Sequence, residues 1–117
     1  MVSEDGKLWD VPGGRPEGDE DWRQTLDREV LEEACASVDA ATLIGFSRGV
    51  CIEGHEAGLV LVRSLWRAEV TLNPWRPQHE MSHRLVTTPE DALERITLAG
   101  LGHPGIYERW LSEALGR

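Results

Sequence analysis

The stretch from Trp22 to Ala36 constrains the fold more than any other part of the sequence. Apolar side chains recur in it every four residues, at Trp22, Leu26, Val30 and Ala34. This spacing places them on one face of a helix, and no Gly or Pro interrupts the pattern before Ala36. The acidic residues from Asp19 to Asp21 suit the positive N-terminal end of such a helix. The stretch therefore predicts an amphipathic helix that packs against the apolar surface of a folded domain.

Segments with the composition of β-strands lie on both sides of this helix. Leu8 to Val11 is an apolar-containing stretch that ends at Pro12-Gly13-Gly14, which predicts the end of a strand running into a loop. Thr42 to Ile52 and Leu59 to Leu72 are rich in β-branched and aliphatic residues. Two of the six residues between them are glycines, so these two segments predict a β-hairpin. Asn73-Pro74 is expected to end its second strand.

A loop and one more strand are expected to follow the hairpin, from Trp75 to Ser82 and from His83 to Thr87 respectively. Thr88 is suited to cap a helix that has Pro89 in its first position. A linker containing glycines, Gly100 and Gly102, leads to a last helix that is expected to begin near Pro104. The apolar face of that last helix comprises Ile106, Trp110, Leu111, Ala114 and Leu115.

Length and composition agree with one folded domain. A chain of 117 residues has room for one core, and strands flanked by helices predict a single layered α/β domain over residues 1–117. The formal net charge of -9, without a basic run to offset it, argues against an extended nucleic-acid surface. The chain shows no secretory signal pattern, no apolar run near the roughly 20 residues of a membrane span and no metal-type cysteine spacing. We expect a cytoplasmic protein without a membrane partner.

Three glutamates, Glu29, Glu32 and Glu33, lie at positions i, i+3 and i+4 of the expected helix. At about 100° per residue their carboxylates share one arc of its surface, where they repel one another unless a cation lies among them. Oxygen ligands favour Mg²⁺ or Mn²⁺, and Mg²⁺ usually completes its coordination with water and phosphate oxygens. The cluster therefore indicates a metal site for phosphate chemistry. The alternative is an ordinary solvated acidic face.

The residues around the cluster resemble the Nudix box, G-x5-E-x7-R-E-U-x-E-E-x-G-U, in which U is an aliphatic residue. The match runs from Gly14 to Ala36, and six of the seven fixed positions agree at the same spacing. Trp9 to Gly14 is also similar to the family's approach to the box, a strand that ends in Pro-Gly-Gly. The resemblance implies a Nudix-type α/β/α sandwich with a mixed sheet. It further implies an enzyme that hydrolyses a small molecule, a nucleoside diphosphate linked to another group.

The resemblance also implies roles for individual residues. The implied ligands of the catalytic Mg²⁺ or Mn²⁺ ions are Glu29, Glu32, Glu33, the main-chain carbonyl of Gly14 and, more indirectly or through water, Glu20. Arg28 would orient the carboxylates by ion pairing, and its i,i+4 relation to Glu32 permits such a pair. The base that takes the proton of the attacking water is implied to be either Glu29 or Glu80.

Two features depart from the Nudix pattern. Cys35 replaces the last glycine of the box, a residue that often ends a helix in the left-handed conformation, so the helix is expected to run on or to end differently. Eleven residues precede Pro12, where the family normally has two strands, so one central strand is expected to be missing. The uncovered sheet would then be completed by a homodimer, or by residues that precede this sequence in the natural protein.

Two other interpretations compete with this one. The segment His79-Glu80-Met81-Ser82-His83 spells H-E-x-x-H, which makes a zinc hydrolase when both histidines face one metal from a helix, although Pro74 and Pro77 argue against that helix. The second interpretation keeps the fold but makes the domain a catalytically silent binder of a nucleotide or a protein. Trp75, in the expected loop, is a weak candidate for stacking on a nucleobase.

Overall fold

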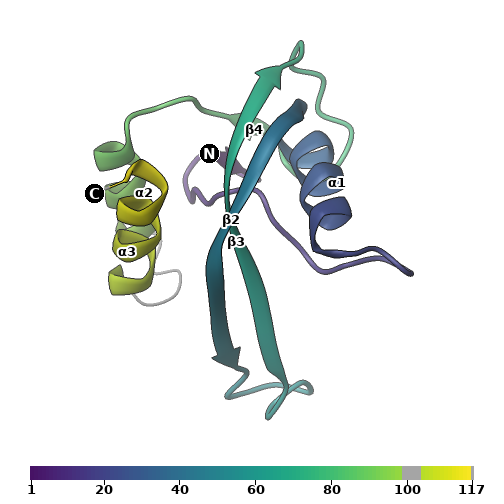
Figure 1. Cartoon of the computed structure of the whole chain (residues 1–117), viewed down its shortest axis with the longest axis vertical. Coiled ribbons are helices and arrows are strands. Elements are labelled where there is room, and N and C mark those ends of the chain that lie inside the picture. The colour runs from purple at the N-terminus through teal and green to yellow at the C-terminus, as the bar shows by residue number, and fades with distance from the viewer. Residues whose placement is uncertain (99–103, 117) are drawn as a thin grey trace.

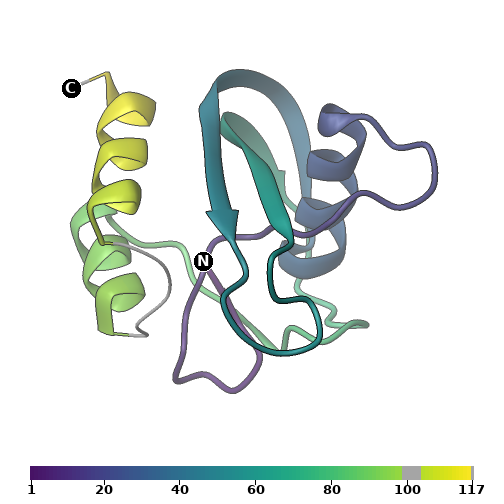
Figure 2. The ribbon, with the colours of Figure 1, turned by 90° about the horizontal axis from the view of Figure 1, so that it is seen from below.

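The computed structural model describes residues 1–98 and 104–116 of the chain. Its elements follow in the order β1 (Val2–Ser3), α1 (Trp22–Ala34), β2 (Ala36–Val50), β3 (Val60–Leu72), β4 (His83–Arg84), α2 (Pro89–Leu98) and α3 (Pro104–Leu115). The long hairpin of β2 and β3 stands in the middle of the molecule, with α1 on one side and the pair α2 and α3 on the other (Figures 1 and 2). The predicted α/β architecture, with helices on both sides of the strands, is confirmed.

The described strands form two separate two-stranded antiparallel sheets. In the larger sheet β2 pairs with β3 from Ala36 opposite Leu72 to Val50 opposite Val60, with two irregularities in the register. In the smaller sheet β1 pairs with β4, with Val2 opposite Arg84. The sheet arrangement thus differs from the expected mixed sheet, because β1 and β4 are each two residues long and no described strand joins them to the hairpin.

The segment before Pro12 turns back on itself instead of forming the expected strand. The Ser3 hydroxyl donates to the carbonyl of Leu8, and the Asp5 carboxylate accepts the main-chain N–H groups of Lys7 and Leu8. This turn leaves a single β-bridge, between Val2 and Asp10. The prediction of a strand over Leu8 to Val11 is therefore wrong, because local side-chain hydrogen bonds compete with strand pairing there.

Helix α1 begins with a capping box and packs its apolar face on the core. The Asp21 side chain accepts the N–H of Gln24, and the Gln24 side chain accepts the N–H of Asp21. The buried cluster against the helix comprises Val2, Val30, Ala34 and Ala36, with Leu26, Val38 and Met81 partly buried around it. The predicted apolar face is confirmed except at its N-terminal end, where Trp22 is half exposed and meets Phe46 edge to face.

The remaining elements lie close to their predicted positions. The first hairpin strand begins at Ala36 rather than near Thr42, because its pairing with β3 continues to the end of that strand. The strand expected from His83 to Thr87 is confirmed only at His83 and Arg84. The Thr88 hydroxyl accepts the N–H of Asp91 and caps α2 as predicted.

The linker glycines Gly100 and Gly102 lie outside the described residues. Beyond them α3 begins at Pro104, as predicted. None of the described helices is long and apolar enough to cross a membrane.

Candidate active site

Two carboxyl groups of α1 meet the turn at Gly13 and Gly14. The Glu33 side chain is buried, with 4% of its residue surface exposed, and its Oε1 accepts the N–H of Gly13 at 3.1 Å. A hydrogen bond also joins the carboxyl groups of Glu33 and Glu29. A Cβ atom added to Gly14 would lie 2.6 Å from the Cδ of Glu29. The Glu29 carboxyl group therefore occupies the space that a side chain at position 14 would need. Because Glu33 is buried, the alternative of an ordinary solvated acidic helix face is wrong for this residue.

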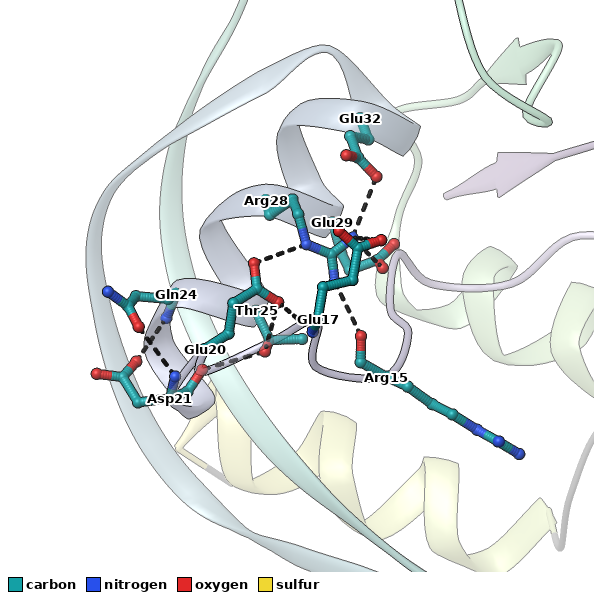
Figure 3. A network of polar contacts seen from close by, with 9 residues as sticks. All are labelled: Arg15, Glu17, Glu20, Asp21, Gln24, Thr25, Arg28, Glu29 and Glu32. Atoms are coloured by element: carbon teal, nitrogen blue, oxygen red, sulfur yellow. Dashed lines mark hydrogen bonds and ion pairs between the residues drawn. The ribbon is translucent and has the colours of Figure 1, made fainter.

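Arg28 ties three carboxylates and the preceding loop together (Figure 3). Its Nε donates to Glu20 at 2.7 Å, and its Nη1 donates to Glu29 at 2.8 Å and to Glu32 at 3.2 Å. Its Nη2 donates to the main-chain carbonyl of Arg15 at 2.8 Å. The i,i+4 contact between Arg28 and Glu32 is present as expected, and the same guanidinium fixes the loop against the helix.

Glu20 belongs to this network through Arg28. Its carboxylate also accepts the N–H of Glu17 and the hydroxyl of Thr25. The hydrogen bond from Arg28, followed by the one from Glu17, holds the pKa of Glu20 below its ordinary range. Glu20 is thus an ionised anchor of the loop between Gly14 and α1.

Glu33 has the opposite electrostatic environment. Burial, followed by the hydrogen bond with Glu29, raises the pKa of Glu33 to about 8. The negative charges of Glu29 and Glu80 raise it further, while the N–H of Gly13 lowers it. Glu80 lies in the exposed loop after β3, and its neighbour Met81 packs against the core cluster that includes Val30 and Ala34 of α1, so this loop lies beside α1.

The glutamate carboxylates of α1 and the Gly14 carbonyl are oxygen ligands that fit a hard divalent cation, although Arg28 contacts two of the carboxylates, those of Glu29 and Glu32. Within residues 1–98 and 104–116, no three His, Cys, Asp or Glu side chains form a ready-made metal group. The Arg28 guanidinium contacts both Glu29 and Glu32 and supplies positive charge to them. Glu29 and Glu33 nevertheless bring two carboxyl groups together beside the Gly14 main chain, and oxygen ligands of this kind suit Mg²⁺ or Mn²⁺.

The helix ends at Cys35 in the manner of a glycine cap. Cys35 has φ 50° and ψ 46°, the left-handed conformation, and its N–H donates to the carbonyl of Leu31. Arg84 Nη1 donates to the carbonyls of Ala34 and Asn73, each at 2.9 Å, and so satisfies the C-terminal end of α1. The expectation that Cys35 lets the helix run on or end differently is therefore wrong. The role of Arg84 escaped the sequence analysis, because no local pattern links it to a helix end about fifty residues earlier.

The H-E-x-x-H segment does not form a zinc site. Residues 79–82 are not helical, and His83 belongs to β4, where its ring lies 6.2 Å from that of Trp9. The zinc interpretation needs both histidines on one helix and is therefore wrong. Trp75 is half-buried, and the guanidinium of Arg84 lies 5.3 Å from its ring centre, so one face of the ring is already occupied.

Comparison with known proteins identifies the family. The sequence profile of the NUDIX domain matches residues 2–109, a range that includes Gly14, all of α1 and Glu80. No curated protein and no solved structure gives a match. Because the profile covers most of the chain, the protein belongs to the Nudix hydrolase family.

Proposed function

We propose that this Nudix hydrolase is a pyrophosphohydrolase that depends on Mg²⁺ or Mn²⁺ and cleaves a nucleoside diphosphate linked to another group. The observation that carries the proposal is the meeting of Glu29 and Glu33 at the Gly13-Gly14 turn. Two carboxyl groups held this close need a proton or a cation to offset their repulsion. The Nudix family to which the chain belongs supplies the reaction class, cleavage of a diphosphate bond.

Each residue of the cluster has a distinct part in the proposal. Glu29, Glu32 and Glu33 hold the cation with the carbonyl of Gly14, and Glu20 contributes indirectly. When bound, the cation neutralises the diphosphate oxygens and lowers the pKa of the attacking water. Arg28 keeps Glu29 and Glu32 oriented, as its contacts of 2.8 and 3.2 Å to them suggest.

The reaction requires one proton acceptor. The water oxygen forms a bond to one phosphorus, the bond between that phosphorus and the bridging oxygen breaks, and the departing phosphate carries away the bond electrons. Glu29 or Glu80 takes the proton of the water. The negative charge of Glu80 acts on Glu33, which supports a position of Glu80 near the reacting groups. Trp75 is the candidate for contact with the nucleobase of the substrate.

A substrate panel tests this proposal. Nucleoside diphosphate sugars, dinucleoside polyphosphates and related diphosphates are incubated with the protein and Mg²⁺ or Mn²⁺, and the nucleotide products are separated by chromatography. We expect hydrolysis of at least one compound that stops when the metal is chelated. Binding of a nucleotide without hydrolysis of any compound would favour the catalytically silent alternative.

The identity of the base is tested by comparing Glu29→Gln with Glu80→Gln. If Glu80 is the base, Glu80→Gln lowers turnover about as much as Glu33→Gln does but leaves Mn²⁺ affinity near that of the wild type. If Glu29 is the base, Glu80→Gln has the smaller effect on turnover, whereas Glu29→Gln lowers both turnover and Mn²⁺ affinity. Both quantities are measured on the same preparations, so that a loss of metal is not mistaken for a loss of the base.

A further inference from the structure

A cavity of about 430 Å³ lies between the hairpin and α3. Its described lining comes from β2, β3 and α3, and none of it comes from α1. Figures 1 and 2 show α1 on the opposite side of the hairpin from α3. Cavities that bind small molecules have volumes of about 300–1,000 Å³. The cavity is therefore large enough for a small ligand and separate from the glutamates of α1.

Apolar side chains form part of the cavity wall. Ile44 of β2 and Leu65 of β3 line it from the hairpin, and Ile106 and Trp110 line it from α3. The two residues of α3 are four positions apart and so lie on one face of the helix. Trp110 is half-buried, and its ring centroid lies 6.0 Å from that of Tyr107. The wall thus offers an aromatic ring and aliphatic groups to a flat apolar ligand group.

Two arginines bring positive charge to the same cavity. Arg48 lies on β2 and Arg109 on α3, and both residues are exposed. Neither guanidinium forms a hydrogen bond or an ion pair with another residue in 1–98 and 104–116, whereas four other arginines there are paired with carboxylates. A guanidinium binds phosphate or carboxylate oxygens through parallel N–H groups. The two arginines are therefore available to an anionic ligand.

One acidic residue, Glu113, also lines the cavity. The charged residues of the described lining are thus two arginines and one glutamate, in a chain whose net charge is -9. Such a local excess of positive charge favours an anion over a cation.

We propose that this cavity binds a small organic anion in which a flat ring carries one phosphate or carboxylate group. The ring packs on Trp110 and the aliphatic side chains, and the anionic group binds Arg48 and Arg109. The two parts of the ligand correspond to the apolar and the positively charged parts of the wall. The proposal does not rest on the proposed hydrolysis, because no glutamate of α1 lines the cavity.

The test is a titration of the ¹⁵N-labelled protein with phenyl phosphate and with benzoate, followed through the indole N–H signal of Trp110. A spectrum of Trp110→Phe assigns that signal. EDTA in the buffer prevents phosphate from binding through a divalent cation at α1. We expect a saturable shift at millimolar concentrations of at least one of the two anions, and the tighter of them identifies the preferred anionic group. Phenol and inorganic phosphate should each bind at least about tenfold more weakly, because each supplies only one part of the ligand.

Three single substitutions test the role of charge, and each removes one charge without removing a described contact. Arg109→Gln should weaken the binding of the tighter anion by about five- to tenfold, because it removes one guanidinium. Glu113→Gln should strengthen it by about two- to fivefold, because it removes the repelling carboxylate. Arg67→Gln is the matched control, since Arg67 is exposed on β3 but does not line the cavity. Its affinity should stay within about twofold of the wild type.

The proposal is overturned if neither anion gives a saturable shift of the Trp110 signal up to about 20 mM. Equal affinities for phenol and phenyl phosphate would also overturn it, and so would equal weakening by Arg109→Gln and Arg67→Gln. Tighter binding in Glu113→Gln supports the anion, whereas weaker binding contradicts it. Signals of residues outside the cavity show whether each variant is folded. None of these results depends on hydrolysis, so a failure of the proposed enzymatic function would be recognised separately.

Discussion

Helix α1 and the β2–β3 hairpin differ in how far their side chains find partners within the chain. At α1, charged side chains are packed close together and are paired: Arg28 donates hydrogen bonds to three carboxylates, and Glu33 contacts Glu29 and the N–H of Gly13. In the half of the β2–β3 hairpin near its connecting loop, apolar side chains such as Val50, Val60 and Val62 are about half exposed to water. The charged groups of α1 have partners within the same chain, whereas several apolar side chains of the hairpin remain exposed to water.

The glutamate cluster and the exposed half of the hairpin are therefore expected to respond differently to substitution. The glutamate cluster is fixed by local hydrogen bonds, so its geometry does not need the free half of the hairpin. The hairpin is long, its register has two irregularities, and several of its apolar side chains are exposed. Substitutions at α1 should therefore change metal binding and turnover, while substitutions of exposed hairpin residues such as Val62 should leave both near their wild-type values.

The largest expected effect is that of Glu33→Gln. We expect turnover to fall by at least about a thousandfold, because the substitution removes a ligand charge from the proposed site. The fold should persist, and the cation-free variant should be at least as stable as the wild type at neutral pH, because glutamine is neutral there without the proton that Glu33 takes up on folding. Turnover and thermal melting are measured on the same sample. Wild-type turnover, or a variant that does not fold, would count against the assignment.

Gly14→Ala tests the contact between the turn and α1. A Cβ atom at this position meets the Glu29 carboxyl group, so we expect a loss of about 1–3 kcal/mol in stability and about a hundredfold in turnover. Gly13→Ala is the control, because a Cβ there meets nothing within 4 Å. It should stay within about 1 kcal/mol of the wild type. Equal effects of the two substitutions would contradict the close approach of Glu29 to Gly14.

The pH dependence of stability sharpens the contrast at Glu33. Its pKa rises from 4.5 to about 8 on folding, so between these values the folded protein keeps a proton that the unfolded chain has lost. The contribution of Glu33 to stability is therefore full below pH 4.5 and decreases as the pH rises towards 8. Melting of the cation-free protein at pH 5, 6, 7 and 8 should show this decrease, and Glu33→Gln should reduce it. A decrease of the same size in the variant would assign it to other groups.

Cys35→Gly should have the smallest effect. The left-handed conformation destabilises a non-glycine residue by about 1–2 kcal/mol. Glycine avoids this strain, but its greater flexibility stabilises the unfolded chain and offsets part of the gain. We expect a gain of about 2–5 °C in the melting temperature. Cys35→Ala keeps the backbone cost and serves as the control. If the glycine variant melts no higher than the alanine variant, the strain at Cys35 is negligible.

Regular elements were predictable where side-chain pattern decides the structure. The four-residue repeat from Trp22 to Ala34 predicted α1, and Thr88-Pro89 predicted the start of α2. The strand expected at Leu8 to Val11 failed because the Ser3 and Asp5 side chains fold that segment into a turn, a choice that depends on hydrogen bonds rather than on pattern. The division into two sheets also depends on which strands meet in space.

The candidate site was predictable in its members but not in its contacts. Helix spacing placed Glu29, Glu32 and Glu33 on one surface and allowed the pair between Arg28 and Glu32. It did not predict that Glu33 is buried, or that Glu29 fills the space at Gly14, because both depend on how the loop folds back on the helix. Nor did it predict the cap by Arg84, which reaches across about fifty residues of sequence.

The proposed divalent-cation site formed by the glutamates of α1 can be tested by Mn²⁺ titration followed by electron paramagnetic resonance. Wild-type protein and Gly13→Ala are compared with Glu33→Gln at the same pH and protein concentration. We predict saturable Mn²⁺ binding in the first two proteins, and an affinity at least about tenfold weaker in Glu33→Gln. Absence of Mn²⁺ binding in the wild type, or equal affinity in all three proteins, would contradict a divalent-cation site at these glutamates.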